Sequence, residues 1–509
     1  MMRRICLVAA VTVGIGAGLC RAEPVYFVDP NLQAVVAKAL DVNEPNEAEM
    51  LELTELKADQ KGIRDLTGLE YAGNLESLSL VGNGINDISP LAGLTNLTEL
   101  NLRVNKVGDI SALGSLTNLR KLEIREVNTY ATPITGVSAL AGLTNLEYLR
   151  MGGNPVESLE PLSKLVSLKT LILEYNIIDD VSALSGLSNL TVFEITRNKV
   201  RDVSPLSELE NLRKLDLATN QIRDISALSA LRNLESLSLR INEVEDISAL
   251  AGLTNLRVLS LGNNRIADIS AVSRLTNLEG LWVYSNEITD VSVLSQLTNI
   301  IQINLSGNQI SDIRPLAGLT NLRSLDLADN QISDISVLSG LENLVQLALQ
   351  VNDIEDLSPL SGLARLEFLR LSYNRITDIS ALSGLEKLST LWLNGNYIED
   401  VSPLVELRKL RALHLEENPL DSAAYYMYLP LMKHYNRRIS MHFDPDPNPP
   451  IDDWDVKIAD LTAFVERFGR LGCSNENGWC DELDMNRSGN LDKHDLAMFG
   501  RQWFGGIGQ

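Results

Sequence analysis

The 509-residue sequence has little of what catalysis or metal chemistry commonly uses. It holds four cysteines and four histidines, and no histidine stands in a recognisable nucleophile or zinc motif. Aromatic residues make up 5% of the chain although 45% is hydrophobic, which is typical of a core built from leucine ladders. Carboxylates are abundant, but they recur at a fixed period, as structural residues do. We therefore predict that the protein is not an enzyme. The histidines all lie in the last fifth of the chain, at His414, His434, His442 and His494.

Positive charge is also scarce. Lys and Arg number 44 against 67 Asp and Glu, and the formal net charge is −23. Removal of residues 1–22, which contain three arginines and no acid, would change it to −26. Such a surface repels DNA, RNA and anionic membranes, so we expect no nucleic-acid partner. After residue 22 no apolar run is long enough to cross a bilayer, and we expect no membrane span.

Residues 1–22 are typical of a secretory signal. Arg3 and Arg4 precede an uncharged run from residue 5 to residue 19, and Cys20-Arg21-Ala22 follows before Glu23. We predict cleavage after Ala22 and a secreted or cell-surface protein. A membrane anchor is disfavoured because the apolar run is short. Lipid attachment at Cys20 is a second alternative, disfavoured by Leu19 at a position where such sites carry a small residue.

One 22-residue pattern accounts for most of the chain, from about residue 53 to residue 420. Its plainest copy, residues 321–342, reads NLRSLDLADNQISDISVLSGLE. Units of this length bury their apolar side only against their neighbours, so they stack into a solenoid. An asparagine marks the period and recurs at intervals of 22, at Asn154, Asn176, Asn198, Asn220, Asn242, Asn264, Asn286, Asn308, Asn330, Asn352, Asn374, Asn396 and Asn418.

Each part of the unit predicts a local structure. Leu325 and Leu327 alternate with polar residues, which puts both on one face of a short strand. Apolar spacings of three follow and indicate a tight helical turn on the return path. Asn330 falls inside the apolar series, where its amide must bond to the backbone of adjacent coils. In the recurring Asp-Ile-Ser-Pro-Leu run we expect Ser at the helix N-cap, Pro in the first helical turn, and a structural role for the Asp.

The repeated LxxLxLxxNxIxDISxLxxL resembles the bacterial, internalin-type leucine-rich repeat proteins over about four-fifths of the chain. The resemblance implies an α/β solenoid, an arc with a concave parallel β-sheet and convex 3₁₀ turns. About fifteen strands at ~4.8 Å spacing would give an arc roughly 70 Å long.

The remaining segments divide into caps, a linker and a second domain. Residues 23–56 are expected to form a helical N-terminal cap, with Asp29-Pro30 and Asn46 followed by Glu49 as helix starts. The repeats occupy residues 57–420, a C-terminal cap 421–443, and a proline-rich linker 444–450. An insertion at 127–135 lengthens one repeat and is either a tolerated loop or part of a binding face.

The concave face is the candidate binding surface. Residues between and after the strand leucines point away from the core, and outward aromatics beside arginine are enriched at recognition surfaces. Part of the middle of this face carries small, uncharged residues, namely Ser236, Ser238, Ser260 and Gly262. His414 lies near its end. The predicted ligand-binding residues are Tyr148, Arg150, Tyr175, Trp282, Tyr284, Phe368, Arg370, Tyr373 and Trp392.

Residues 451–509 differ in kind and contain one twelve-residue EF-hand loop, from Asp484 to Asp495. Oxygen side chains stand at the ligand positions and Gly489 takes the sharp turn, which predicts one Ca²⁺ site. A faded copy lies 35 residues earlier, with Pro449, Ile451 and Lys457 at ligand positions, so we expect no metal there. The predicted ligands are Asp484, Asn486, Ser488, Asn490, Asp492 and Asp495.

The paired loop-and-helix units resemble the dockerin module, which implies a cohesin-like partner on another secreted protein. Cys473 and Cys480 are the cysteines that remain after export, and a disulfide is expected in an oxidising compartment. Closing so short a loop would add roughly 2–3 kcal/mol in the chain-entropy model. Zinc is the weaker alternative, because two cysteines without paired histidines give too few ligands.

These observations favour a secreted or cell-surface binding protein. Its arc would recognise a protein or glycan, and its calcium module would attach it to another component. The alternative is a non-catalytic targeting subunit of a polysaccharide-degrading assembly.

Overall fold

The computed structural model describes residues 23–124, 134 and 136–445. The predicted signal sequence, residues 127–133 and 135 of the insertion, and residues 446–509 lie outside this range. The predicted calcium ligands and the Cys473–Cys480 pair therefore also lie outside it.

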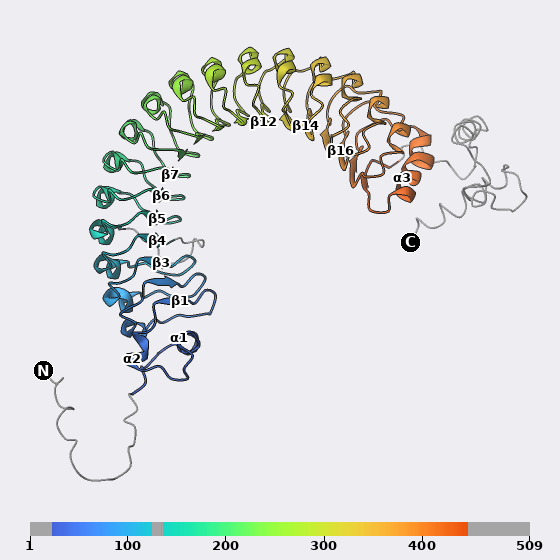
Figure 1. The fold of residues 1–509 in the computed structure, drawn as a ribbon. Coiled ribbons are helices and arrows are strands. Elements are labelled where there is room, and N and C mark those ends of the chain that lie inside the picture. Colours follow the sequence, from blue (N-terminus) through green and yellow to red (C-terminus); the bar gives the residue numbers. More distant parts are fainter. Residues whose placement is uncertain (1–22, 125–133, 135, 446–509) are drawn as a thin grey trace, which may run out of the picture.

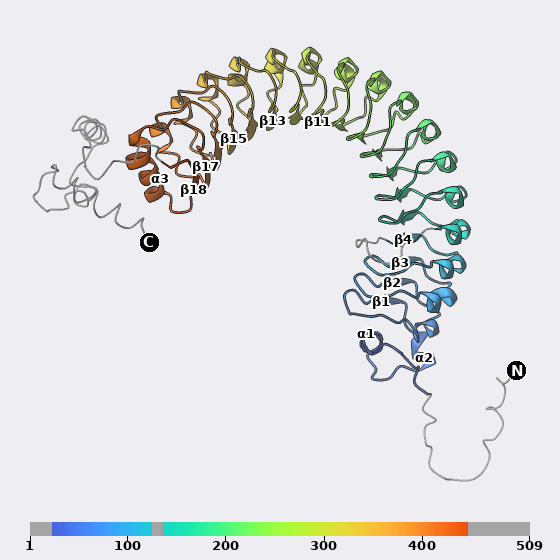
Figure 2. The ribbon, with the colours of Figure 1, turned by 180° about the vertical axis from the view of Figure 1, so that it is seen from behind.

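The described residues form a long open arc in which one coil follows another (Figure 1). The strands line the inside of the arc and the helical turns line the outside, as Figure 2 shows from behind. In the described part of the chain, eighteen parallel strands of three residues each form one sheet, and each strand pairs with the next along the chain. They are β1 Glu55–Lys57, β2 Ser77–Ser79, β3 Glu99–Asn101, β4 Lys121–Glu123, β5 Tyr148–Arg150, β6 Thr170–Ile172, β7 Val192–Glu194, β8 Lys214–Asp216, β9 Ser236–Ser238, β10 Val258–Ser260, β11 Gly280–Trp282, β12 Gln302–Asn304, β13 Ser324–Asp326, β14 Gln346–Ala348, β15 Phe368–Arg370, β16 Thr390–Trp392, β17 Ala412–His414 and β18 Ser440–His442.

The apolar repeat positions form a continuous core along the arc. The central residue of each strand pairs with its equivalent in the next coil, for example Leu325 with Leu347, and both are buried. The predicted arc with a concave parallel sheet and convex 3₁₀ turns is confirmed. The expected count of about fifteen strands was too low, in part because β18 lies in the predicted C-terminal cap and β1 begins in the predicted N-terminal cap.

Sixteen 3₁₀ turns line the outer side of the described arc. They are η1 Leu69–Tyr71, η2 Ser89–Gly93, η3 Ser111–Ser115, η4 Ser138–Gly142, η5 Glu160–Leu162, η6 Ser182–Leu184, η7 Ser204–Glu208, η8 Ser226–Ala230, η9 Ser248–Gly252, η10 Ser270–Arg274, η11 Ser292–Gln296, η12 Arg314–Gly318, η13 Ser336–Gly340, η14 Ser358–Leu360, η15 Ser380–Leu382 and η16 Ser402–Leu404.

The expectation that Ser caps these turns was wrong. At η9 the N-cap residue is Ile247, which has no capping side chain, and Ser248 is the first residue of the turn. The backbone N–H of Ser248 donates to Asp246 Oδ1 at 2.8 Å. This backbone hydrogen bond lowers the pKa of Asp246 below its ordinary value. The recurring Asp therefore supplies the acceptor, while Pro stands in the first turn as predicted, for example Pro205.

The repeat asparagine holds successive coils together through the backbone. Asn286 is buried, and its Oδ1 accepts from the N–H of Ile266 in the preceding coil at 3.0 Å. Its Nδ2 donates to the carbonyls of Leu261 at 3.1 Å and Val283 at 3.0 Å. Most of the described coils repeat this pattern with little change, for instance at Asn352. The asparagine amides of neighbouring coils together satisfy backbone groups that the turns would otherwise leave buried and unpaired.

Both ends of the arc are covered. At the N-terminal end α1 Pro30–Leu40 begins at Asp29, whose carboxylate accepts from the N–H groups of Asn31 and Leu32 and, at 2.7 Å, from that of Arg64 in the first coil. The short helix α2 Glu47–Met50 has the predicted capping box of Asn46 and Glu49. At the other end the π-helical turn η17 Ala424–Tyr428 leads into α3 Leu429–Tyr435, and β18 follows. Within the described ranges, no helix combines the length and apolarity that crossing a membrane requires.

Replacement of a ladder asparagine should cost far more stability than its size suggests. Asn286→Ala leaves the N–H of Ile266 without a partner, while the carbonyls of Leu261 and Val283 each lose one of two donors, and we expect a loss of about 2–4 kcal/mol in the free energy of unfolding. Urea unfolding measures this loss, and hydrogen exchange should show faster exchange at the Ile266 amide.

A second asparagine series supplies the matched control. Asn277 is exposed and makes one bond, from Nδ2 to the carbonyl of Thr254 at 2.9 Å. We expect Asn277→Ala to change stability by about 1 kcal/mol or less. Equal losses for Asn277→Ala and Asn286→Ala would contradict the structural role assigned to the buried ladder.

Candidate binding surface

The inner wall of the arc consists of the outward residues of the sheet. On each strand the residues before and after the central apolar one face away from the core, because side chains alternate along a strand. Parallel pairing without slippage aligns these residues in columns, as Asp326, Ala348, Arg370 and Trp392 show on β13 to β16. A ligand on this wall would therefore contact columns of residues that are far apart in sequence.

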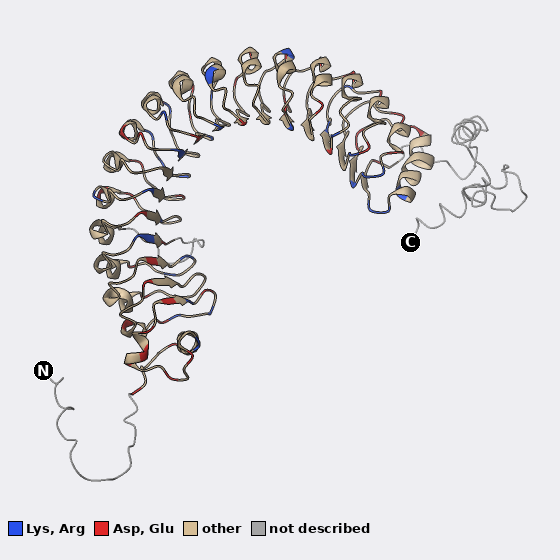
Figure 3. Cartoon of the chain, in the orientation of Figure 1, with Lys and Arg blue, Asp and Glu red and all other residues tan. Residues whose placement is uncertain are grey.

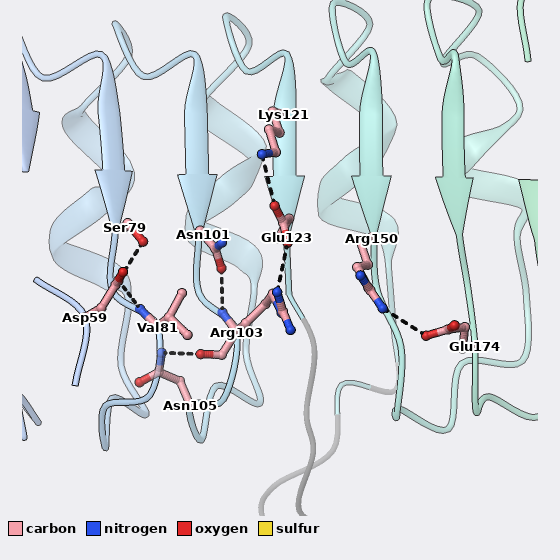
Figure 4. Close-up of polar contacts among 10 residues, drawn as sticks. All are labelled: Asp59, Ser79, Val81, Asn101, Arg103, Asn105, Lys121, Glu123, Arg150 and Glu174. Atoms are coloured by element: carbon pink, nitrogen blue, oxygen red, sulfur yellow. Dashed lines mark hydrogen bonds and ion pairs between the residues drawn. The ribbon is translucent and has the colours of Figure 1, made fainter. Parts of the chain in front are cut away.

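Charged residues near the N-terminal end of the wall pair with one another (Figure 4). Glu123 is buried and bonds to Lys121 at 3.1 Å and to Arg103 at 3.6 Å. The hydrogen bond to Glu123 raises the pKa of Lys121. Arg150 pairs with Glu174 at 3.2 Å, so this predicted binding residue is already held by a neighbour on the next coil.

The aromatic residues at this end lie beside cations. The ring of Tyr148 on β5 lies 5.4 Å from the amino group of Lys121. Tyr175 is exposed and stands just before the repeat asparagine, where the backbone has a positive φ of 58°. The guanidinium of Arg197, its equivalent in the next coil, lies 4.9 Å from the Tyr175 ring. These cation–π contacts favour the observed orientation of both tyrosines.

In the middle of the wall, two aromatic rings pack directly against the backbone of glycine residues. Trp282 lies on β11, and Tyr284, two residues later, faces the same way. A Cβ added at Gly280 would lie 2.4 Å from the Trp282 ring, and one added at Gly262 would lie 2.4 Å from the Tyr284 ring. Both rings therefore rest directly on glycine backbone. The sequence analysis assigned no contact to Gly262 and so missed that the Tyr284 ring packs on it. The sequence does show that Gly262 lies one coil before Tyr284, which could have indicated the contact.

The C-terminal part of the wall gathers the largest group of predicted residues. Phe368 and Arg370 are exposed on β15, and the Arg370 guanidinium lies 4.5 Å from the ring of Trp392 on β16. Trp392 meets His414 on β17 edge to face at 5.2 Å. Tyr373, in the turn after β15, bonds to Glu417 at 3.3 Å. The predicted set thus forms three groups, and at ~4.8 Å per strand the first group on β5 lies about 30 Å from Trp282 on β11.

Two carboxylates on the wall are desolvated by burial. Desolvation raises the pKa of Asp216, and it also raises the pKa of Asp326, where the charge of Arg370 opposes the change. Elsewhere along the arc basic and acidic residues are interleaved (Figure 3). Arg370 is therefore a cation that lies near both a desolvated carboxylate and an aromatic ring.

A shallow polar cavity of about 670 Å³ lies beside the middle strands. Among its lining residues, Arg213 pairs with Glu235 and Arg257 with Glu279, each at 2.5 Å. These charges are satisfied by each other, so the cavity offers a ligand less than the aromatic groups of the wall do.

A side chain at Gly280 should displace the ring that rests on it. We expect Gly280→Ala to move Trp282 and to lower the free energy of unfolding by about 1–3 kcal/mol, because the added methyl group overlaps the ring. Tryptophan fluorescence, read against Trp282→Phe to isolate this residue, measures the displacement. Gly252→Ala is the control, since a Cβ there has no atom within 4 Å. Unchanged Trp282 fluorescence in Gly280→Ala would refute the packing of the Trp282 ring against Gly280.

Comparison with known proteins agrees with this geometry. The family profile described as Leucine Rich repeats (2 copies) matches residues 73–115, 95–142, 144–186, 188–230, 232–274, 276–318, 320–362 and 364–424. No curated protein matches the chain.

Solved structures of bacterial repeat proteins are similar to the described arc. The leucine-rich repeat protein LIC12759 of Leptospira interrogans matches with 24% identity and a TM-score of 0.63, over 80% of this chain and 98% of that one. The functional domain of InlJ from Listeria monocytogenes matches with 23% identity and a TM-score of 0.59, over 77% and 81%. The internalin InlF of Listeria monocytogenes matches with 33% identity and a TM-score of 0.49, over 72% and 95%. The first two likenesses show the fold.

Proposed function

The chain belongs to the leucine-rich repeat family, and from this premise we propose that it is a secreted or cell-surface binding protein. Its concave wall would recognise a protein or glycan ligand, and its C-terminal calcium module would attach it to another component. Repeat solenoids of this family are typically non-enzymatic scaffolds that bind partners on their concave surface.

The observation that carries this proposal is the fixed orientation of the aromatic residues on the wall. Trp282 rests on Gly280, Tyr284 rests on Gly262, and Trp392 lies between Arg370 and His414. Aromatic rings that are already ordered lose little conformational freedom on binding, so they contribute strongly to affinity. Three groups spread along the wall suit an extended partner surface better than a small molecule.

A protein partner fits these groups better than a glycan does. Exposed arginine beside tryptophan and phenylalanine, as at Arg370, Trp392 and Phe368, is the side-chain combination enriched at protein interfaces. The alternative of a targeting subunit in a polysaccharide-degrading assembly uses the same wall and differs in the ligand that it holds. Its support is the dockerin-like sequence of residues 451–509.

Removal of the wall aromatics should abolish recognition without unfolding the arc. After a ligand is found by capture on arrays of secreted proteins and glycans, we expect Arg370→Ala with Trp392→Ala to weaken binding about 30-fold or more, equal to about 2 kcal/mol. Surface plasmon resonance measures the change. Tyr397→Ser is the control, since Tyr397 is exposed beyond the repeat asparagine and off the wall. Full affinity in the double variant, or an equal loss in Tyr397→Ser, would place recognition elsewhere.

The calcium module is tested separately on the full chain. We expect calorimetry to find one Ca²⁺ bound through the Asp484–Asp495 loop, and Asp484→Ala with Asp492→Ala to abolish it, because a hard cation needs several converging oxygens. Asp453→Ala, outside the loop, should leave binding intact. Equal calcium uptake by the native chain and the loop variant would refute the proposed site.

A further inference from the structure

Two histidines and a carboxylate converge at the C-terminal end of the wall. The last two strands, β17 and β18, pair in parallel with His414 opposite His442, and their rings stack at 4.4 Å between centroids and 7° between planes. Glu416 lies two residues after His414 and so on the same face. Its Oε1 lies 3.3 Å from His414 Nδ1. One possible ligand atom from each of the three residues lies within 4.8 Å of the other two.

The convergence leaves one polar atom unsatisfied. Glu416 Oε2 is buried and finds no hydrogen-bond partner among the described residues. Nearby, Trp392 Nε1 is also buried and unpartnered within that part of the chain. A buried carboxylate oxygen without a partner is costly, and such groups commonly face an ion or ordered water. A structural His–Glu hydrogen bond explains Oε1 but does not explain Oε2.

We propose that His414, Glu416 and His442 bind a divalent transition-metal ion, with Zn²⁺ as the representative. Imidazole nitrogens favour zinc and its neighbours, whereas calcium and magnesium favour all-oxygen sites. Zinc–nitrogen bonds of ~2.0–2.1 Å require ligand atoms about 3.4 Å apart in a tetrahedron. His442 is exposed on the last strand, so the proposed site requires a rotation of its side chain that closes the remaining distance.

Three protein ligands leave the fourth position of a tetrahedral ion open. His414 contacts Trp392, which in turn contacts Arg370, so the ion would lie next to the aromatic part of the wall. A carboxylate or imidazole of a docked partner would complete the coordination, which gives the wall a metal-dependent contact. Metal binding itself does not depend on whether such a partner exists.

The test uses the full chain, freed of metal with EDTA and then saturated with Ca²⁺, so that the predicted EF-hand loop is occupied. ZnCl₂ is titrated by calorimetry, and Co²⁺, whose bound form absorbs visible light, is titrated in parallel. Native protein should bind one equivalent more tightly, by 10-fold or more, than His442→Gln, His414→Gln or Glu416→Gln, since loss of a ligand should cost at least as much as loss of an outer-shell partner. Circular dichroism checks that each variant folds.

The matched control is His434→Gln, which removes an exposed histidine of α3 and should bind as the native protein does. Zinc should also raise the unfolding midpoint of the native chain and of the control, and not that of His442→Gln. Equal zinc stoichiometry and affinity in native protein and His442→Gln would overturn the site and place the ion elsewhere, for example at Cys473 and Cys480. Unchanged binding in Glu416→Gln would likewise overturn it, because the carboxylate is one of its three ligands.

Discussion

The side-chain amide of the repeat asparagine is the interaction on which the arc depends. The chain must turn sharply after each strand, and the turn exposes backbone donors and acceptors to an apolar interior. In the coil around Asn286 one side chain satisfies the N–H of Ile266 and the carbonyls of Leu261 and Val283. Because two of these groups belong to the preceding coil, the same amide also fixes the spacing between coils. Stacking thus depends on directed hydrogen bonds as much as on the apolar core.

That spacing determines what the inner wall can present. With every strand paired without slippage, a residue at one repeat position always lies beside the residue 22 positions later in a regular coil. Arg370 therefore lies beside Trp392, and Trp392 beside His414, although none is a sequence neighbour of another. Glycine has a complementary role, since Gly262 allows Tyr284 from the next coil to lie flat. The scaffold is uniform, and specificity resides in the few outward positions where it varies.

Much of this was predictable from sequence, because the period carries the information. Leu325 and Leu327 on one strand face, the inward Asn330, and proline in the first turn all follow from local rules that each coil repeats. The N-terminal cap was also readable, since Asp29 and the Asn46–Glu49 box use standard helix-start chemistry. The turn cap was misassigned because Asp and Ser are both good acceptors. Which one caps depends on the backbone path, and that path puts Ile247 at the N-cap, so that Asp246 bonds to the N–H of Ser248.

The convergence of His414 and His442 shows where sequence reasoning fails. Regular coils place neighbours 22 residues apart, but these two histidines are separated by 28, because the α3 segment is inserted before the last strand. Ser440–His442 also has a methionine in place of the usual leucine at its centre, and the preceding helix made the whole segment resemble a cap. Once β18 is known to pair with β17, parallel register alone brings the histidines together, and the alternation of side chains adds Glu416. The three residues are visible in the sequence, but their proximity could be predicted only by recognising β18 as a strand, and the 22-residue period does not extend to β18.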